Sequence, residues 1–225
     1  MIEAILPDWV ATAESRLDGP EDHLFDVERE VIVNAVSKRR AEFSTVRACA
    51  RIALAELGIA PAPILPGERG APQWPAGVVG SMTHCQDYRG AAVAPDRLAI
   101  SIGLDAEPHA PLPDGVFELV ARPEEQQQLA VLATGHPHVH WERLLFTMKE
   151  SVYKAWFPIT HRWLDFQEAS IRIDPDAECF VAELLVPGPE LEGVELTAFH
   201  GRFLVQGDLA MSAIVLTSAD LHPAG

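Results

Sequence analysis

Apolar and polar residues follow helical spacing in two stretches near the N-terminus. Residues 21–36 begin with acidic side chains, which suit the first turn of a helix. Residues 37–57 form a second helical pattern that Ser37 can cap and that ends before a glycine. Residues 59–77 are rich in proline and glycine and are predicted to form a loop. Period-2 and short apolar runs then predict three strands, at 78–83, 90–94 and 98–105.

The second half of the chain repeats this order of helices followed by strands. Helical spacing covers 123–133 and 138–156. Four extended runs follow, at 168–173, 179–186, 194–205 and 209–217, and the sequence Gln-Gly-Asp at 206–208 predicts a hairpin between the last two. The pattern indicates an α+β fold, with an N-terminal half at 1–106 and a C-terminal half at 107–225. Residues 1–20 are expected to pack as an irregular arm.

Composition and charge narrow the class of protein. The chain has 225 residues, of which 48% are hydrophobic and 22% charged, so a core can form without disulfides. Its three cysteines, Cys49, Cys85 and Cys179, form no CxxC pair, which fits a reducing cytoplasm. The sequence contains no bilayer-length apolar run and no signal-peptide pattern, so we expect a soluble intracellular protein. The net charge of −16 argues against nucleic acid and membrane partners.

Basic residues are concentrated in one part of this acidic chain. Five of the 17 lysines and arginines lie within 14 residues, and only Glu42 opposes them: Lys38, Arg39, Arg40, Arg47 and Arg51. Helical spacing places Arg39 within the apolar stripe, where a guanidinium group needs an anionic partner. That partner is either a phosphate, which we favour, or one of the many acidic side chains. A solvated helix face is the third alternative.

Three acidic residues in two short segments are the strongest candidates for chemistry. Asp105 and Glu107 are two apart on a predicted strand, so their side chains share a face. Glu150 and Lys154 are four apart on a predicted helix and also share a face. Carboxylates without histidine or cysteine partners suit a hard cation such as Mg2+. The alternatives are a solvated strand end and an ordinary exposed helix pair.

Other polar clusters carry weaker signals. The segment 80–85, GSMTHC, offers Ser81, Thr83 and His84 as hydrogen-bonding groups for phosphate, or forms a polar turn. The alternating histidines at 136, 138 and 140 are not expected to bind zinc, because Pro137 and a helix start scatter them. The sequence contains no GxSxG, GxGxxG or Walker A motif.

Four segments together resemble the Sfp-type 4′-phosphopantetheinyl transferases, most closely the actinobacterial branch. They are SKRRAEFSTVRACARIAL at 37–54, the stretch from 61 to 94 that contains GVVGSMTHC, SIGLDAEPH at 101–109 and WERLLFTMKESVYKAWFP at 141–158. The resemblance implies two similar α/β halves in a pseudo-twofold arrangement with the active site between them. It also implies transfer of 4′-phosphopantetheine from coenzyme A to a carrier-protein serine, with release of adenosine 3′,5′-bisphosphate.

The resemblance further implies roles for individual residues. The metal, Mg2+ or alternatively Mn2+, is expected on Asp105, Glu107 and Glu150. Glu150 or Lys154 is expected to accept the serine proton. Residues expected to bind coenzyme A, or to line its cleft, are Arg39, Arg47, Ser81, Thr83, His84, Lys149 and Lys154. Relatives tend to carry a lysine where this chain has Pro66, and Arg69 is expected to supply that charge.

The partners implied by the resemblance are apo acyl and peptidyl carrier proteins or domains of fatty-acid, polyketide or nonribosomal-peptide synthases. We expect the enzyme to act as a monomer. Two other functions use the same residues: a Mg2+-dependent hydrolase of coenzyme A or a related pyrophosphate, and a non-catalytic coenzyme A-binding module. The intact acid set and Lys154 argue against the binding module.

Overall fold

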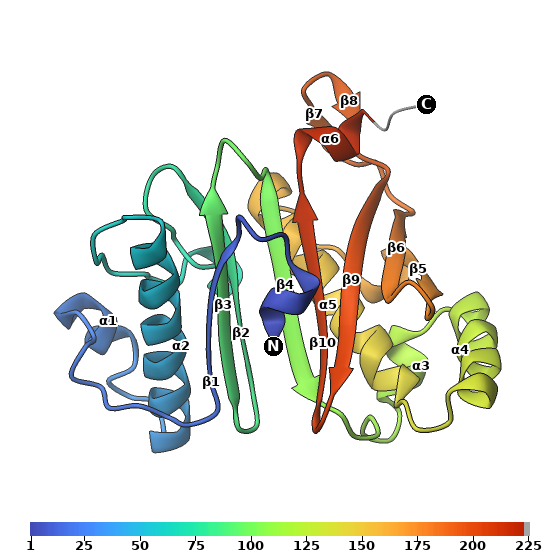
Figure 1. Ribbon diagram of the computed structural model, residues 1–225, viewed down its shortest axis with the longest axis horizontal. Coiled ribbons are helices and arrows are strands. Elements are labelled where there is room, and N and C mark those ends of the chain that lie inside the picture. Colours follow the sequence, from blue (N-terminus) through green and yellow to red (C-terminus); the bar gives the residue numbers. More distant parts are fainter. Residues whose placement is uncertain (223–225) are drawn as a thin grey trace.

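Two antiparallel sheets lie side by side, and one long helix packs against each of them (Figure 1). The computed structural model describes residues 1–222. The first sheet has the strand order β1-β3-β2, and α2 packs against β1 and β3. The elements of this half are η1 Ile2–Ile5, β1 Ala11–Ser15, α1 Asp26–Val31, α2 Ser37–Glu56, η2 Glu68–Gly70, β2 Val78–Cys85 and β3 Tyr88–Pro95.

The second sheet has the order β4-β10-β9-β6-β5, and α5 packs against β4 and β10. Its half also holds the short pair β7 Glu190–Leu191 and β8 Val194–Glu195. The remaining elements are β4 Ser101–Pro108, α3 Val116–Val120, α4 Pro123–Gly135, α5 Trp141–Thr160, η3 Phe166–Glu168, β5 Ala169–Asp174, β6 Cys179–Leu184, β9 Ala198–Gln206, β10 Leu209–Leu216 and α6 Ser218–Leu221. The α+β class is confirmed, with helix against sheet in both halves and three strands in one but five in the other.

Most predicted elements are present, and the largest differences lie near the N-terminus. The N-terminal arm is not irregular, because β1 pairs with β3 from Ala11 opposite Val93 to Ser15 opposite Arg89. Its sequence, ATAES, has little strand character, so only the tertiary pairing defines it. The helix predicted at 21–36 is limited to α1, which ends before Ile32, a buried residue with non-helical backbone angles (φ −107°, ψ 7°). The hairpin between β9 and β10 is confirmed, with Gly207 at φ 62° in its turn.

The predicted division at residue 106 falls inside a strand and needs correction. Strand β4 pairs with β10 along its whole length, from Ser101 opposite Leu216 to Pro108 opposite Leu209. The strand that carries Asp105 therefore belongs to the second sheet, although the sequence places it directly after β2 and β3. A division between β3 and β4 follows the pairing, and strand order of this kind is not visible in a local pattern.

Two hydroxyl groups join the sheets. Ser81 Oγ accepts a hydrogen bond from the backbone N–H of Leu104 at 3.0 Å, and Thr83 Oγ1 accepts one from Ala106 at 3.1 Å. These side chains of β2 take the place of backbone carbonyl groups that a neighbouring strand would offer to β4. The N-terminal half is thus fixed in register against the strand that carries the acids.

The helix α5 lies unusually close to β4. A Cβ atom added to Gly103 would lie 1.9 Å from the carbonyl oxygen of Ser151, so only glycine permits this approach. Ser101 Oγ donates to the carbonyl of Ala155 at 2.7 Å and ties the same pair of elements. The apolar face of α5, including Leu145 and Met148, is buried in the core. Within residues 1–222, none of the helices has the length and apolarity required to cross a membrane.

Candidate active site

The carboxylate of Asp105 is the most enclosed of the three acids of the candidate site. Its side chain is 7% exposed and extends from β4 toward α5. Lys154 Nζ donates to Oδ1 at 2.7 Å, and Thr83 Oγ1 donates to the same oxygen at 3.1 Å. The other oxygen, Oδ2, is buried and has no hydrogen-bond partner within the described chain. A buried carboxylate oxygen without a donor favours a cation as its missing partner.

Glu150 and Lys154 lie one turn apart on α5 and face the end of β4. Lys154 also donates to the carbonyl oxygen of Leu104 at 3.0 Å, so its ammonium group is fixed on the strand. Glu150 is half-buried and forms no hydrogen bond or ion pair with residues 1–222. Burial raises the pKa of Glu150, the charge of Asp105 raises it further, and Lys154 opposes the shift.

Glu107 is two residues beyond Asp105 and has its own basic partner. Arg143 Nη1 donates to Glu107 Oε2 at 3.1 Å, and the same guanidinium group holds the carbonyl oxygens of Ala110 and Pro111. Burial, followed by the charge of Asp105, raises the pKa of Glu107 to about 7. Asp105 has a raised pKa as well, mainly from burial. The three acids therefore lie close enough to disfavour one another's ionisation.

The three carboxylates fit a metal ion in their chemistry but are not placed around one. Within residues 1–222, no three His, Cys, Asp or Glu side chains are placed as a ready-made metal site. The side chains instead show Asp105 paired with Lys154 and Glu107 paired with Arg143. The chemistry nevertheless fits a hard divalent cation, because all donors are carboxylates, one buried oxygen lacks a partner and the acids repel one another.

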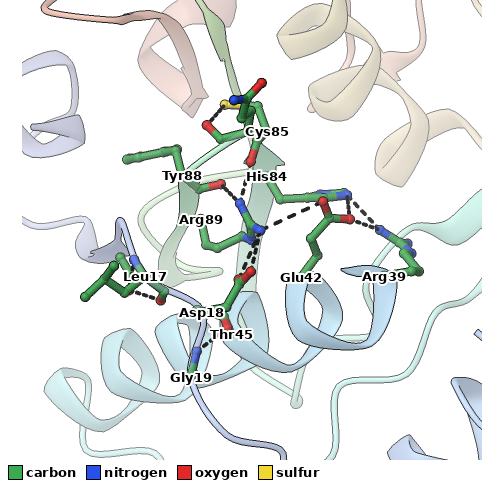
Figure 2. A network of polar contacts seen from close by, with 12 residues as sticks. Leu17, Asp18, Gly19, Arg39, Glu42, Thr45, His84, Cys85, Tyr88 and Arg89 are labelled. Carbon is green, nitrogen blue, oxygen red and sulfur yellow. Dashed lines mark hydrogen bonds and ion pairs between the residues drawn. The ribbon is translucent and has the colours of Figure 1, made fainter. Parts of the chain in front are cut away.

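His84 follows Thr83 on β2 and forms the opposite side of the site with Arg39 of α2 (Figure 2). Arg39 Nη1 donates to His84 Nε2 at 2.6 Å, which requires that nitrogen to be unprotonated. Partial burial, followed by the charges of Arg39 and Lys154, lowers the pKa of His84 to about 4. The ring is therefore neutral at pH 7 in the free protein, and an anion nearby would restore its tendency to bind a proton.

A pocket of about 600 Å³ lies between the two halves, beside Glu150 and Lys154. Its walls are the loop 67–74, the start of β2 and the second part of α5, and they include Ser81, Glu150 and Lys154. Arg69 lines the same pocket and places its guanidinium carbon 5.2 Å from the ring centre of Trp163. Acidic, basic and apolar surfaces thus meet in one cavity, which suits a ligand with phosphates at one end and an apolar arm.

Comparisons with known proteins identify the fold and the chemistry. Residues 27–94 match the 4′-phosphopantetheinyl transferase N-terminal domain, and residues 101–206 match the 4′-phosphopantetheinyl transferase superfamily. The chain belongs to this superfamily. It is 53% identical to the 4′-phosphopantetheinyl transferase Svp of Streptomyces mobaraensis, over 100% of this chain and 91% of the relative. It is 45% identical to PptT of Mycobacterium tuberculosis, over 96% and 98%.

A third relative, Npt of Nocardia iowensis, is 48% identical over 95% of this chain and 99% of its own. These full-length matches confirm an actinobacterial Sfp-type enzyme, as the sequence predicts. The protein is a transferase that attaches 4′-phosphopantetheine to carrier proteins.

Two side chains of this transferase that were predicted to contact coenzyme A are paired inside the protein instead. The guanidinium group of Arg47 is buried, donates to the carbonyl of Ile64 at 2.8 Å and lies 3.7 Å from Glu28. Lys149 Nζ is buried 2.8 Å from Glu125 and donates to backbone carbonyl groups of the C-terminal half. Both side chains are paired with acids distant in sequence. We therefore propose structural roles for both, in place of the coenzyme A contacts that the resemblance implies.

The basic cluster at 38–51 is therefore mostly used within the fold of this phosphopantetheinyl transferase. Arg40 pairs with Glu21 through both carboxylate oxygens, and Arg51 donates to Glu28 at 2.9 Å. Arg39 remains half-exposed beside His84, so it does not point into the body of the protein as its helical position predicts. It reaches out to the edge of the site instead.

Arg143 and Glu42 belong to the surroundings of the transferase site and were not singled out from the sequence. Arg143 lies seven residues before Glu150, a spacing that places both on one face of a helix and would have indicated it. Glu42 lies three residues after Arg39 and projects toward the same histidine (Figure 2). From the sequence, Glu42 is recognisable only as the one acid that opposes the basic cluster.

Proposed function

We propose that this enzyme takes 4′-phosphopantetheine from coenzyme A and transfers it to a serine hydroxyl of an apo acyl or peptidyl carrier protein, with Mg2+. The observation that carries the proposal is the pairing of Lys154 with Asp105 beside the unpartnered Glu150, at the mouth of the pocket between the halves. Manganese is an alternative metal. Because both halves of one chain build the pocket, we expect a monomer to be active.

The residues divide into those that bind the donor and those that act on the proton. Lys154, His84 and Arg39 form a cationic and hydrogen-bonding edge for the phosphates, and Arg69 extends it along the pocket. Ser81 and Thr83 keep the two walls in register. Asp105, Glu107 and Glu150 are the residues that would hold the metal, which supplies positive charge to the pyrophosphate.

In the transfer step, the serine oxygen forms a bond to the phosphorus that bears pantetheine. The bond from that phosphorus to the bridging oxygen breaks, and adenosine 3′,5′-bisphosphate leaves with the electron pair. Lys154 stabilises the developing charge on the leaving group.

Glu150 is our candidate for the base that accepts the serine proton. Its pKa is raised by burial and it has no partner within residues 1–222, so it is available to bind a proton. Lys154 is less suited, because its ammonium group forms an ion pair with Asp105 at 2.7 Å, and the neutral amine that a base requires would no longer neutralise that carboxylate.

The test is intact-protein mass spectrometry of apo carrier proteins incubated with enzyme, coenzyme A and Mg2+, with an EDTA control. We expect a metal-dependent mass gain of one phosphopantetheine. Glu150→Gln should lower the rate at least about 100-fold, the smallest effect usual for a general base. Glu142→Gln, on an exposed position of the same helix, is the matched control. A Glu150→Gln enzyme that folds normally and transfers at the wild-type rate would refute the assignment.

A further inference from the structure

Glu42 occupies the centre of a polar network that borders the proposed phosphate edge (Figure 2). Its side chain is 13% exposed, so most of its surface is removed from water. Three basic groups surround the carboxylate: Arg39 Nη1 at 3.9 Å, His84 Nε2 at 3.8 Å and Arg89 Nη2 at 3.8 Å. No other acid in the described chain faces both Arg39 and His84.

These distances decide how Glu42 can act. Contacts of 3.8–3.9 Å are too long to be hydrogen bonds, so the carboxylate does not orient Arg39 or His84 by directed bonding. Arg39 already has a short bond of 2.6 Å to the histidine. Glu42 therefore acts on its neighbours through charge, which at this separation still has an appreciable effect.

Behind Glu42, the network is fixed by a buried arginine. Arg89 Nη2 lies 3.0 Å from Asp18, and its Nη1 donates to the backbone carbonyls of Cys85 and Tyr88. Its side chain is 5% exposed. The guanidinium group cannot move toward a ligand without leaving these acceptors, so its positive charge stays beside Glu42.

In the free network, two carboxylates offset the charges of the two arginines, which leaves less positive charge to attract a phosphate. Arg39 and Arg89 face the carboxylates of Glu42 and Asp18, and His84 is neutral. A phosphate that binds Arg39 and His84 would enter the space where Glu42 already neutralises them. Two anions would then share one set of cations, and their repulsion would reduce the affinity.

We propose that Glu42 is a built-in counter-anion of the phosphate subsite, which weakens binding of the donor's adenosine 3′-phosphate and promotes release of the bisphosphate product. The inference rests on the proposed function, because it requires a phosphate at Arg39 and His84. The released nucleotide carries the same phosphate as the donor, so an anion that repels it increases the rate at which the enzyme is freed.

The test is isothermal titration calorimetry with adenosine 3′,5′-bisphosphate as the probe, without carrier protein. Glu42→Gln keeps the shape of the side chain and removes its charge. We expect it to bind the bisphosphate about fivefold more tightly than wild type, the size of one charge interaction at about 4 Å in water. The gain should shrink at high salt. It should be absent with adenosine 5′-monophosphate, which lacks the 3′-phosphate.

A matched control separates this effect from a change in net charge. Glu56→Gln removes the same charge from the far end of α2, where Glu56 is exposed, and should bind like wild type. Unchanged or weaker binding by Glu42→Gln, with an unchanged melting temperature, would overturn the proposal.

The variant Arg39→Ala distinguishes a failure of the counter-anion role from an error in the proposed position of the phosphate. If Arg39→Ala weakens binding but Glu42→Gln does not tighten it, only the counter-anion role is wrong. If Arg39→Ala binds like wild type, the phosphate does not lie there, and both the counter-anion role and the phosphate-binding role of Arg39 are overturned.

Discussion

Replacing Glu28 with alanine should strongly destabilise the protein, because this one carboxylate neutralises two buried arginines. Glu28 is fully buried on α1. Arg51 Nη1 donates to its oxygens at 2.9 and 3.2 Å, and Arg47 Nε lies 3.7 Å away. The backbone N–H of Ile64 donates to the same group at 2.8 Å. Glu28 therefore joins α1, α2 and the loop that leads to the pocket.

The magnitude follows from what the substitution leaves behind. Removing one partner of a buried ion pair typically costs about 3–5 kcal/mol, because the remaining charge stays buried without compensation. Here the Arg51 guanidinium group and the backbone N–H groups of Ile64 and Phe25 lose their acceptor together, and Arg47 loses the opposite charge 3.7 Å away. We take about 4 kcal/mol as the expected loss in the free energy of unfolding. For a chain of this size, this corresponds to a melting temperature about 8–16 °C lower.

The assay is thermal denaturation followed by circular dichroism. Glu30→Ala is the matched control, since Glu30 is exposed on the same helix and should change the melting temperature by less than about 2 °C. Replacing Glu28, Arg47 and Arg51 together by apolar residues of similar volume should recover much of the loss, because no charge then remains buried. A Glu28→Ala protein that melts with wild type would refute the reasoning and return Arg47 to the candidates for ligand binding.

Two further predictions concern the acidic strand. Gly103→Ala should lower both the melting temperature and the transfer rate, because the new Cβ would lie 1.9 Å from Ser151 O and push α5 away from β4. Gly135→Ala is the control and should change neither, because nothing lies within 4 Å of its added Cβ. Melting curves and transfer rates of both variants check this. Glu107 has a pKa of about 7, above its ordinary value, so its contribution to stability is present below about pH 4.5 and is lost toward pH 7. Metal-free Glu107→Gln should therefore lose less stability than wild type over that range, and equal losses in both proteins would contradict the assignment.

Local patterns were sufficient to predict the candidate acids but not their partners. Asp105 and Glu107 share a face because strands alternate, and Glu150 and Lys154 share one because helices turn every 3.6 residues. Each rule needs only neighbouring residues. The ion pair between Lys154 and Asp105 joins residues 49 apart, and it depends on how α5 packs against β4. No periodicity encodes that packing, although Gly103 allows it.

The basic cluster shows the same limit of local patterns. Its density in the sequence correctly predicted anionic partners, but for Arg40, Arg47 and Arg51 those partners are Glu21 and Glu28. Both acids precede the helix, in the segment whose structure the sequence predicted least well. Without their positions, an arginine that binds a ligand and an arginine that holds the fold have the same pattern.

Burial separates these two kinds of arginine once the structure is known. The side chains of Arg47 and Arg51 are 6% and 10% exposed, and their partner Glu28 is fully buried. A phosphate could bind these guanidinium groups only if their buried ion pairs with Glu28 were broken, at the full energetic cost. Arg39 is 51% exposed and lies 3.9 Å from Glu42, too far for a hydrogen bond, so it can contact a phosphate without breaking a bond to that acid. Lys154, at 27%, lies between these cases. A ligand phosphate can therefore contact Arg39 and Lys154 at a lower cost than Arg47.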